Sequence, residues 1–135
     1  MPTSILIPVA IDHEPLVDAK IATARRMLDR QGRITLLTVL EAIPGFTAEF
    51  VTVKSENHLT AKVMANLKSA AGDATDIDCR VTTGKPGIRI SEVAKEIGAD
   101  LIIVGAHHPS AMEYFLGSTA SRVARRAPCS VLIQR

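Results

Sequence analysis

The chain has 135 residues, of which 47% are hydrophobic and 22% are charged. This length and composition predict one domain over residues 1–135 and exclude a disordered, collagen-like or disulfide-stapled chain. The net charge of +2 is too balanced for a nucleic-acid partner, and the aromatic content of 3% disfavours a module that stacks bases.

Short aliphatic runs alternate along the chain with segments of helical spacing. Aliphatic runs rich in β-branched residues are typical of strands buried on both faces, and apolar residues three or four positions apart are typical of amphipathic helices. In chain order the pattern predicts the strand Ile5–Ile11, a helix from Val17 to Leu28, the strand Ile34–Val39, a helix from Leu59 to Leu67, the strand Ile77–Val81, a helix from Ile90 to Ile97, the strand Leu101–Val104, a helix from Ala120 to Ala127 and the strand Ser130–Ile133.

Punctuating residues support these helices. Proline is favoured at the first helical position, serine caps helix starts, and glycine ends helices. The predicted first residues are Pro15 and Pro86, the predicted caps are Ser55 and Ser118, and the predicted stops are Gly32, Gly72 and Gly98.

Regular alternation of strands and helices predicts an α/β fold with a parallel sheet. We expect a single doubly wound five-stranded sheet in the order 3-2-1-4-5, with four helices divided between both faces. The alternating run Ile77–Val81 suits an edge strand. Ligands of such sheets bind beyond the carboxyl ends of the strands where the winding direction switches, which here lies between the first and fourth strands.

Several residues with suitable chemistry follow these strand ends. Asp12 either accepts hydrogen bonds from a ribose hydroxyl or adenine amino group, or caps the first helix. Gly117-Ser118-Thr119 opens the fourth helix, where free amides and the helix dipole favour an anion, and Arg122, Arg125 and Arg126 follow it. Gly84-Lys85-Pro86-Gly87 either brings Lys85 to a phosphate or forms a tight turn.

Some common sites are absent from the sequence. It has no Walker A motif, no GxGxxG and no Cys/His metal spacing, so we expect no metal site. No 18-residue apolar run is present, and the segment before Ile5 lacks the basic start of a signal peptide, so we expect a cytoplasmic protein without a membrane partner. Cys79 and Cys129 lie in apolar strand contexts and are predicted to be buried, reduced thiols.

The chain resembles the universal stress proteins, a family of nucleotide-binding α/β proteins. The resemblance runs from Ile5-Leu6-Ile7-Pro8-Val9 and Asp12 to Pro128-Cys129-Ser130-Val131-Leu132-Ile133. The ATP-binding branch carries Gly-x2-Gly-x9-Gly-Ser/Thr after the fourth strand. This chain has Gly105 and Gly117-Ser118, but His108 replaces the middle glycine and the spacing is one residue shorter.

The resemblance implies binding of ATP, with or without magnesium, by a stress-response or signalling module. It implies a nucleotide site at Pro8, Val9, Asp12, Val39, Gly84, Gly105, His107, His108, Gly117, Ser118 and Thr119. It also implies a homodimer through the last strand, Val131–Arg135.

Fast phosphoryl transfer needs a positioned base and a metal-holding carboxylate, and only Asp12 and Glu113 are acids near this site. We therefore expect no catalytic residues and slow or absent hydrolysis. The alternatives are a nucleotide-free dimeric interaction protein of the same fold and a slow ATPase or autophosphorylating enzyme.

Overall fold

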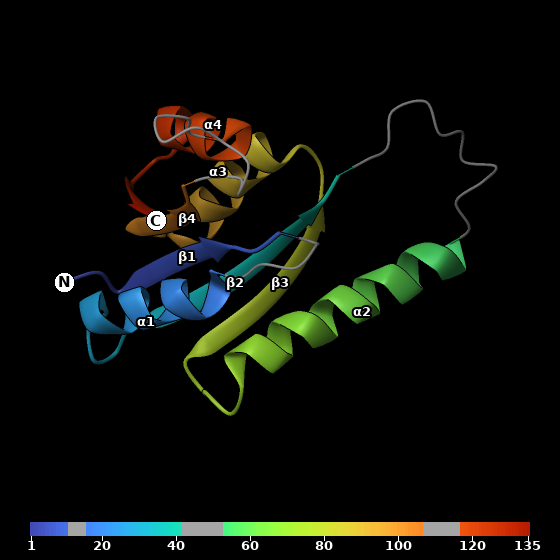
Figure 1. Cartoon of the computed structure of the whole chain (residues 1–135), viewed down its shortest axis with the longest axis horizontal. Coiled ribbons are helices and arrows are strands. Elements are labelled where there is room, and N and C mark those ends of the chain that lie inside the picture. Colours follow the sequence, from blue (N-terminus) through green and yellow to red (C-terminus); the bar gives the residue numbers. More distant parts are fainter. Residues whose placement is uncertain (11–15, 42–52, 107–116) are drawn as a thin grey trace.

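The computed structural model describes residues 1–10, 16–41, 53–106 and 117–135, with the backbone alone described for residues 53–57. Its elements alternate as expected (Figure 1). In chain order they are β1 (Ser4–Pro8), α1 (Val17–Met27), β2 (Arg33–Leu40), α2 (Val53–Ala71), β3 (Ile77–Thr83), α3 (Pro86–Ile97), β4 (Leu101–Gly105), α4 (Ser118–Arg126) and β5 (Ser130–Gln134).

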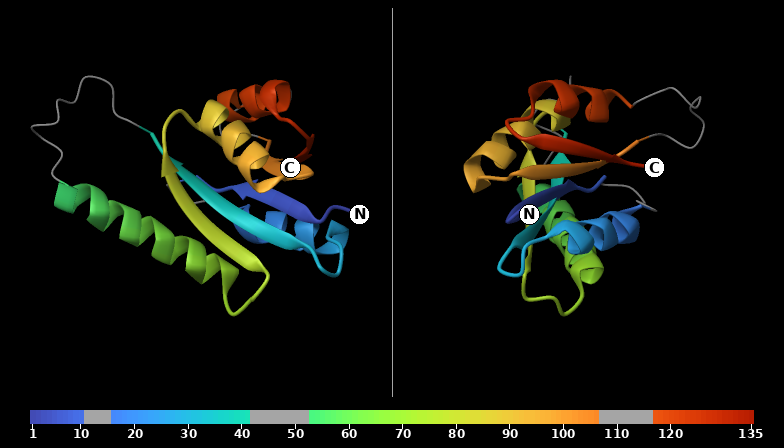
Figure 2. Two further views of the ribbon diagram at one scale, coloured as in Figure 1. Left: turned by 180° about the vertical axis from the view of Figure 1, so that it is seen from behind. Right: turned by 90° about the vertical axis from the view of Figure 1, so that its left-hand side faces the viewer.

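The five strands form one parallel sheet in the order β3-β2-β1-β4-β5, which confirms the predicted order. Helices α1 and α2 cover one face and α3 and α4 cover the other (Figures 1 and 2). Successive strand residues point to opposite faces, so each central strand feeds two apolar layers. In β1, for example, Ile5 and Ile7 pack in the layer of α1 and α2, while Leu6 packs in the layer of α3 and α4.

The glycines predicted to stop the second and third helices do so. Gly72 follows α2 with a φ of 62°, and Gly98 follows α3 with a φ of 66°. Both angles lie in the left-handed region, where a residue with a Cβ is strained. Pro86 is the first residue of α3, as expected.

Three other predicted helix boundaries are wrong. Helix α1 ends at Met27, because Leu28 turns to extended backbone with a ψ of 137°, well before Gly32. Ser118 is the first helical residue of α4, and Gly117 occupies the cap position. Ser55 lies inside α2, which begins at Val53. Pro15 lies outside the described residues.

The first strand is also shorter than predicted, since β1 ends at Pro8 rather than at Ile11. Its pairing with β2 continues to Pro8 and Leu37, whereas its pairing with β4 stops at Leu6 and Ile102. Proline has no N–H to donate to a neighbouring strand, so it ends the ladder on the β4 side. The hydrogen-bonded pairing of β1 with β4 therefore ends before the carboxyl ends of the two strands.

The two edge strands, β3 and β5, are both only partly buried. Strand β3 packs against α2, and β5 carries Ile133, whose side chain is 40% exposed. Cys79 and Cys129 are free thiols but only half-buried, so their predicted burial is wrong. Burial nevertheless raises the pKa of both thiols. Within the described residues, no helix is long and apolar enough to cross a membrane.

Candidate functional site

Parallel strands bring all their carboxyl ends to one edge of the sheet, here called the carboxyl edge. Helices α3 and α4 both begin at this edge. The described residues of the expected site that follow or end these strands, or open α4, are Pro8, Val9, Val39, Gly84, Gly105, Gly117, Ser118 and Thr119. Asp12, His107 and His108 lie outside the described residues.

The centre of the carboxyl edge is the gap between β1 and β4. The N–H and C=O of one peptide group in a strand point toward opposite neighbouring strands. The Val9 N–H donates to the Leu37 carbonyl of β2 at 2.7 Å, so the preceding Pro8 carbonyl faces the β4 side. This carbonyl accepts a hydrogen bond from Nζ of Lys20 at 3.1 Å. A side chain of α1, rather than an amide of β4, is therefore the partner of the last β1 carbonyl.

A second buried side chain fixes the next peptide group. The Thr38 hydroxyl donates to the Val9 carbonyl at 3.0 Å. The side chains of Lys20 and Thr38 are each only 1% exposed. Side chains of α1 and β2 thus bind the carbonyls of Pro8 and Val9, which fixes the backbone where the chain leaves the sheet.

The other wall of the gap is the end of β4. The Ala106 N–H donates to the Gln134 carbonyl of β5 at 2.9 Å, which leaves the Gly105 amide facing the β1 side. A methyl group on Gly105 would lie 3.6 Å from Cδ1 of Leu16, an ordinary contact. The Gly117 N–H donates to the Ala106 carbonyl at 3.4 Å, so the start of α4 is tied to the end of β4.

Two helix N-termini add positive potential to this edge. The cap residue of α3 is Lys85 and that of α4 is Gly117, and the described residues give neither helix a side-chain cap or an acidic residue in its first turn. The first amides of a helix have no intrahelical acceptor, and the helix dipole is positive there. The carboxyl edge therefore favours an anion above the sheet.

Two glycines allow the turn into α3 and the close packing of α3 against α4. Gly84 ends β3 with a φ of 138°, a conformation that residues with a Cβ rarely adopt, and its N–H donates to the Leu40 carbonyl at 3.0 Å. A methyl group on Gly87 would lie 2.7 Å from Cβ of Arg122. Only glycine lets α3 and α4 approach this closely without one of them shifting.

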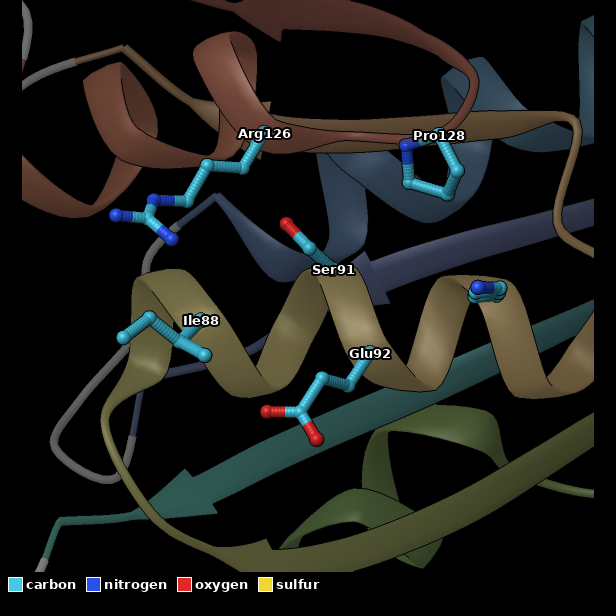
Figure 3. A pocket seen from close by; sticks show the side chains of 6 residues that line it. Ile88, Ser91, Glu92, Arg126 and Pro128 are labelled. Atoms are coloured by element: carbon cyan, nitrogen blue, oxygen red, sulfur yellow. The ribbon is translucent and has the colours of Figure 1, made fainter.

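Arg126, at the end of α4, lies on another surface. The Arg126 side chain lines a groove of about 350 Å³ between the outer surfaces of α3 and α4, with Ile88, Ser91, Glu92, Lys95 and Pro128 (Figure 3). These α3 residues alternate with the buried residues Ile90, Val93 and Ala94, so the groove lies on the side of α3 away from the sheet. It is separate from the gap between β1 and β4.

The sequence reasoning missed Lys20 and Thr38. Lys20 lies on the same helical face as Val17, Ile21 and Ala24, so a lysine within an apolar stripe was the signal that could have revealed it. Within the described residues, no group of three His, Cys, Asp or Glu side chains is placed to hold a metal ion.

Comparison with known proteins agrees with this architecture. Residues 5–135 match the Universal stress protein family. Universal stress protein G of Salmonella typhimurium is 29% identical over 139 residues, which cover 98% of each chain.

Three solved structures share the fold. The structure of hypothetical protein MJ0577 superposes with a TM-score of 0.80 at 20% identity and covers 97% of this chain and 94% of its own. A universal stress protein in complex with cAMP has a TM-score of 0.68 at 24% identity, covering 99% and 97%. One from Archaeoglobus fulgidus in complex with dAMP has a TM-score of 0.58 at 16% identity, covering 97% and 98%. The chain belongs to the universal stress protein family.

Proposed function

We propose that the chain binds an adenine nucleotide at the carboxyl edge, over the gap between β1 and β4, and that ATP is its ligand. The gap itself carries this proposal. Strand pairing stops at Leu6 and Ile102, although β4 continues to Gly105. A doubly wound sheet binds its ligands at such a point, where neighbouring strands lead to helices on opposite faces.

The polar groups around the gap suit a phosphorylated ligand. The starts of α3 and α4 supply amides and positive dipole ends, Lys85 is the cap residue of α3, and Arg122 lies in the second turn of α4. Phosphate groups bind readily at helix N-termini. The half-buried Pro8, Val9 and Val39 supply apolar contacts for a base.

The relatives support adenine as the base. Two universal stress proteins with this fold were solved with cAMP and with dAMP. Both ligands contain an adenine ring and a phosphate group. Within the proposed site, Pro8, Val9, Asp12 and Val39 would border the adenosine. Gly84, Gly105, His107, His108, Gly117, Ser118 and Thr119 would hold the ribose and phosphates.

The first test is to denature the purified protein and separate the released small molecules by anion exchange with ultraviolet detection. We expect an adenine nucleotide near one per chain. Titration calorimetry of stripped protein with ATP, ADP and AMP, each with and without magnesium, then identifies the preferred phosphate state. Folded protein that neither carries nor binds any adenine nucleotide would contradict the proposal and favour a nucleotide-free interaction protein.

We further propose a homodimer formed by antiparallel pairing of β5 across a two-fold axis. The Gln134 carbonyl faces β4, so the peptide groups of Val131 and Ile133 face away from the sheet. An edge strand with free peptide groups and exposed apolar side chains invites pairing with another strand.

The dimer is tested with Ile133→Glu, which changes a side chain that is 40% exposed and should leave the fold intact. Ile88→Glu is the matched control, because Ile88 is 37% exposed but lies in the α3–α4 groove. Light scattering at micromolar concentration should show dimers for the wild type and Ile88→Glu, and monomers for Ile133→Glu. A monomeric wild type would exclude the dimer.

A further inference from the structure

The groove between the outer surfaces of α3 and α4 combines apolar and charged side chains. Ile88 is 37% exposed there, although it is a large aliphatic residue, and the exposed Pro128 also lines the groove. The charged side chains of the lining are Glu92, Lys95 and Arg126. The groove lies outside the proposed nucleotide site, so its chemistry needs an account of its own.

Glu92, the acidic side chain of the groove, already has a cationic partner. It accepts a hydrogen bond from Nη1 of Arg89 at 3.4 Å, and Figure 3 shows it directed away from α4. Arg89 also pairs with Glu96, which in turn pairs with Arg80 of β3. These charges therefore compensate one another, and they leave the positive charges of the groove unanswered.

Lys95 and Arg126 are those positive charges. In the part of the chain that the structure describes, neither side chain forms an ion pair, and α4 itself contains no acidic residue. Both lie in the last turn of a helix, where the dipole favours a cation. The dipole supplies only about half an elementary charge at each helix end, so it offsets only part of these two cations. Arg122 and Arg125 are also exposed on α4 and add to the excess.

We propose that this groove binds an acidic segment of a partner protein. An aliphatic side chain of that segment would cover Ile88, and its carboxylates would lie beside Lys95 and Arg126. Clusters of cationic side chains recognise acidic motifs, and burial of apolar surface adds affinity that does not depend on charge. The proposal does not depend on nucleotide binding.

Other occupants fit the groove less well. A second copy of this chain in a symmetric contact would present the same positive surface, and like charges repel across an interface. A nucleic acid offers phosphates to Lys95 and Arg126, but it has no flexible aliphatic side chain to cover Ile88. An acidic segment with an aliphatic residue matches both features.

The test titrates isotope-labelled wild-type protein with a blocked peptide that has one leucine between runs of glutamate. We expect the amide resonances of α3 and α4 to shift, and binding to weaken as salt is added, because salt screens exposed charges. Absence of such shifts at peptide concentrations up to about 1 mM would overturn the proposal.

Two control peptides separate the charge from the apolar contact. One has glutamine in place of each glutamate, and the other has serine in place of the leucine. Both should bind more weakly than the first peptide. Equal binding of either control would overturn the proposal, and so would tighter binding of a thymidine oligonucleotide, which would assign the surface to nucleic acid.

Charge reversal tests the two cations. Lys95→Glu and Arg126→Glu change exposed side chains, and each should lower affinity for the acidic peptide about fivefold, as the strongest exposed ion pairs do. The double variant should prefer a peptide with lysine in place of glutamate, a reversal that a disturbed fold cannot produce. Lys62→Glu is the matched control, because Lys62 is exposed on α2 across the sheet, and it should leave affinity unchanged at about 0.1 M salt.

Ile88→Ser tests the apolar contact. It should abolish the preference for leucine over serine in the peptide and leave the preference for glutamate over glutamine intact. A leucine preference that survives in Ile88→Ser would overturn the placement of the segment on Ile88. If a variant fails to fold, the peptide comparisons on the wild-type chain still decide the proposal.

Discussion

The amino and carboxyl edges of the sheet differ in the side chains that hold the strand ends: carboxylates at the amino edge, and the buried Lys20 and Thr38 at the carboxyl edge. At the amino edge, charged side chains join the starts of strands to each other and to α1. Asp100 accepts hydrogen bonds from the Thr3 and Ser4 amides at 2.9 and 3.2 Å, and also from the Thr3 hydroxyl. Two ion pairs also lie at this edge, Arg25–Asp76 and Arg33–Asp78.

These ion pairs change the pKa values of the carboxylates in them. The Arg25 guanidinium lowers the pKa of Asp76 by hydrogen bonding, and Arg33 does the same for Asp78. At the carboxyl edge, Lys20 and Thr38 instead donate to the Pro8 and Val9 carbonyls, and backbone bonds join Val9 to Leu37 and Ala106 to Gln134.

The difference between the edges separates stability from binding. Side-chain carboxylates at the amino edge occupy the amides that they meet, so those amides have no capacity left for a ligand. At the carboxyl edge, backbone bonds and the side chains of Lys20 and Thr38 hold strand carbonyls, while the starts of α3 and α4 keep the amides that a helix leaves without an intrahelical acceptor. We therefore expect substitutions at the amino edge to change stability alone, and substitutions at the carboxyl edge to change nucleotide affinity.

The largest effect is expected for Gly87→Ala, which breaks the contact that sets α4 against α3. The new methyl group would lie 2.7 Å from Cβ and 2.9 Å from Cδ of Arg122, so one helix must move. Overpacking of this kind costs about 1–3 kcal/mol in the free energy of unfolding. Nucleotide affinity should fall as well, because the start of α4 is displaced. Denaturant unfolding and calorimetry measure the two effects.

A double variant checks the cause of that loss. Arg122→Gly removes the clashing Cβ, and its own helix-propensity cost of about 1 kcal/mol is measured in the single variant. Gly87→Ala should then cost less in the Arg122→Gly background than in the wild type. If the two substitutions are additive, the helix contact is not the source of the instability.

An intermediate effect is expected for Gly117→Ala, which tests ligand approach without disturbing the fold. A methyl group on Gly117 would meet no atom of the described residues within 4 Å, and the φ of −56° at this position suits any residue. The free energy of unfolding should change by no more than about 0.5 kcal/mol. Affinity for ATP should fall about tenfold if the phosphates approach this backbone, a loss of about 1.4 kcal/mol. Unchanged affinity would move the phosphates away from the start of α4.

Much of the fold could be predicted from the sequence because each element carries its own signal. Buried parallel strands appear as continuous aliphatic runs, and their alternation with helices allows few topologies. Gly72 and Gly98 were found as helix stops because their role depends on one residue's own backbone freedom. The placement of Gly84, Gly105 and Gly117 at one edge followed from the topology.

The remaining features depend on tertiary partners. Pro8 ends β1 because its nitrogen faces β4 and carries no hydrogen to donate. The strand that this nitrogen faces is set by the register of β1 with its neighbours. The role of Lys20 was missed because the pattern of apolar residues treats a lysine as exposed, and its burial depends on a carbonyl twelve residues away. Helix α1 ends because Leu28 adopts extended backbone, and no glycine or proline at that point of the sequence indicates the end of the helix.

The smallest effect is expected at the amino edge, where Asp100→Asn should weaken the fold without altering nucleotide affinity. Burial acts to raise the pKa of Asp100, but hydrogen bonds from Thr3 and Ser4 outweigh it and the pKa is lowered. The carboxylate is exposed, so water competes for these bonds and their loss should cost about 1 kcal/mol at pH 7.

The pH dependence of this loss follows from the lowered pKa. The stabilisation is complete above the unfolded-state pKa of about 3.9 and is lost as the pH falls through the lower folded-state value. The difference between wild type and Asp100→Asn should therefore shrink below about pH 4 in denaturant titrations. Asp78→Asn is the matched comparison, because the Arg33–Asp78 pair is 53% exposed on both sides and should contribute less to stability than the Asp100 bonds. Loss of nucleotide affinity in either variant would show that the two edges are coupled, and the separation of stability from binding would then fail.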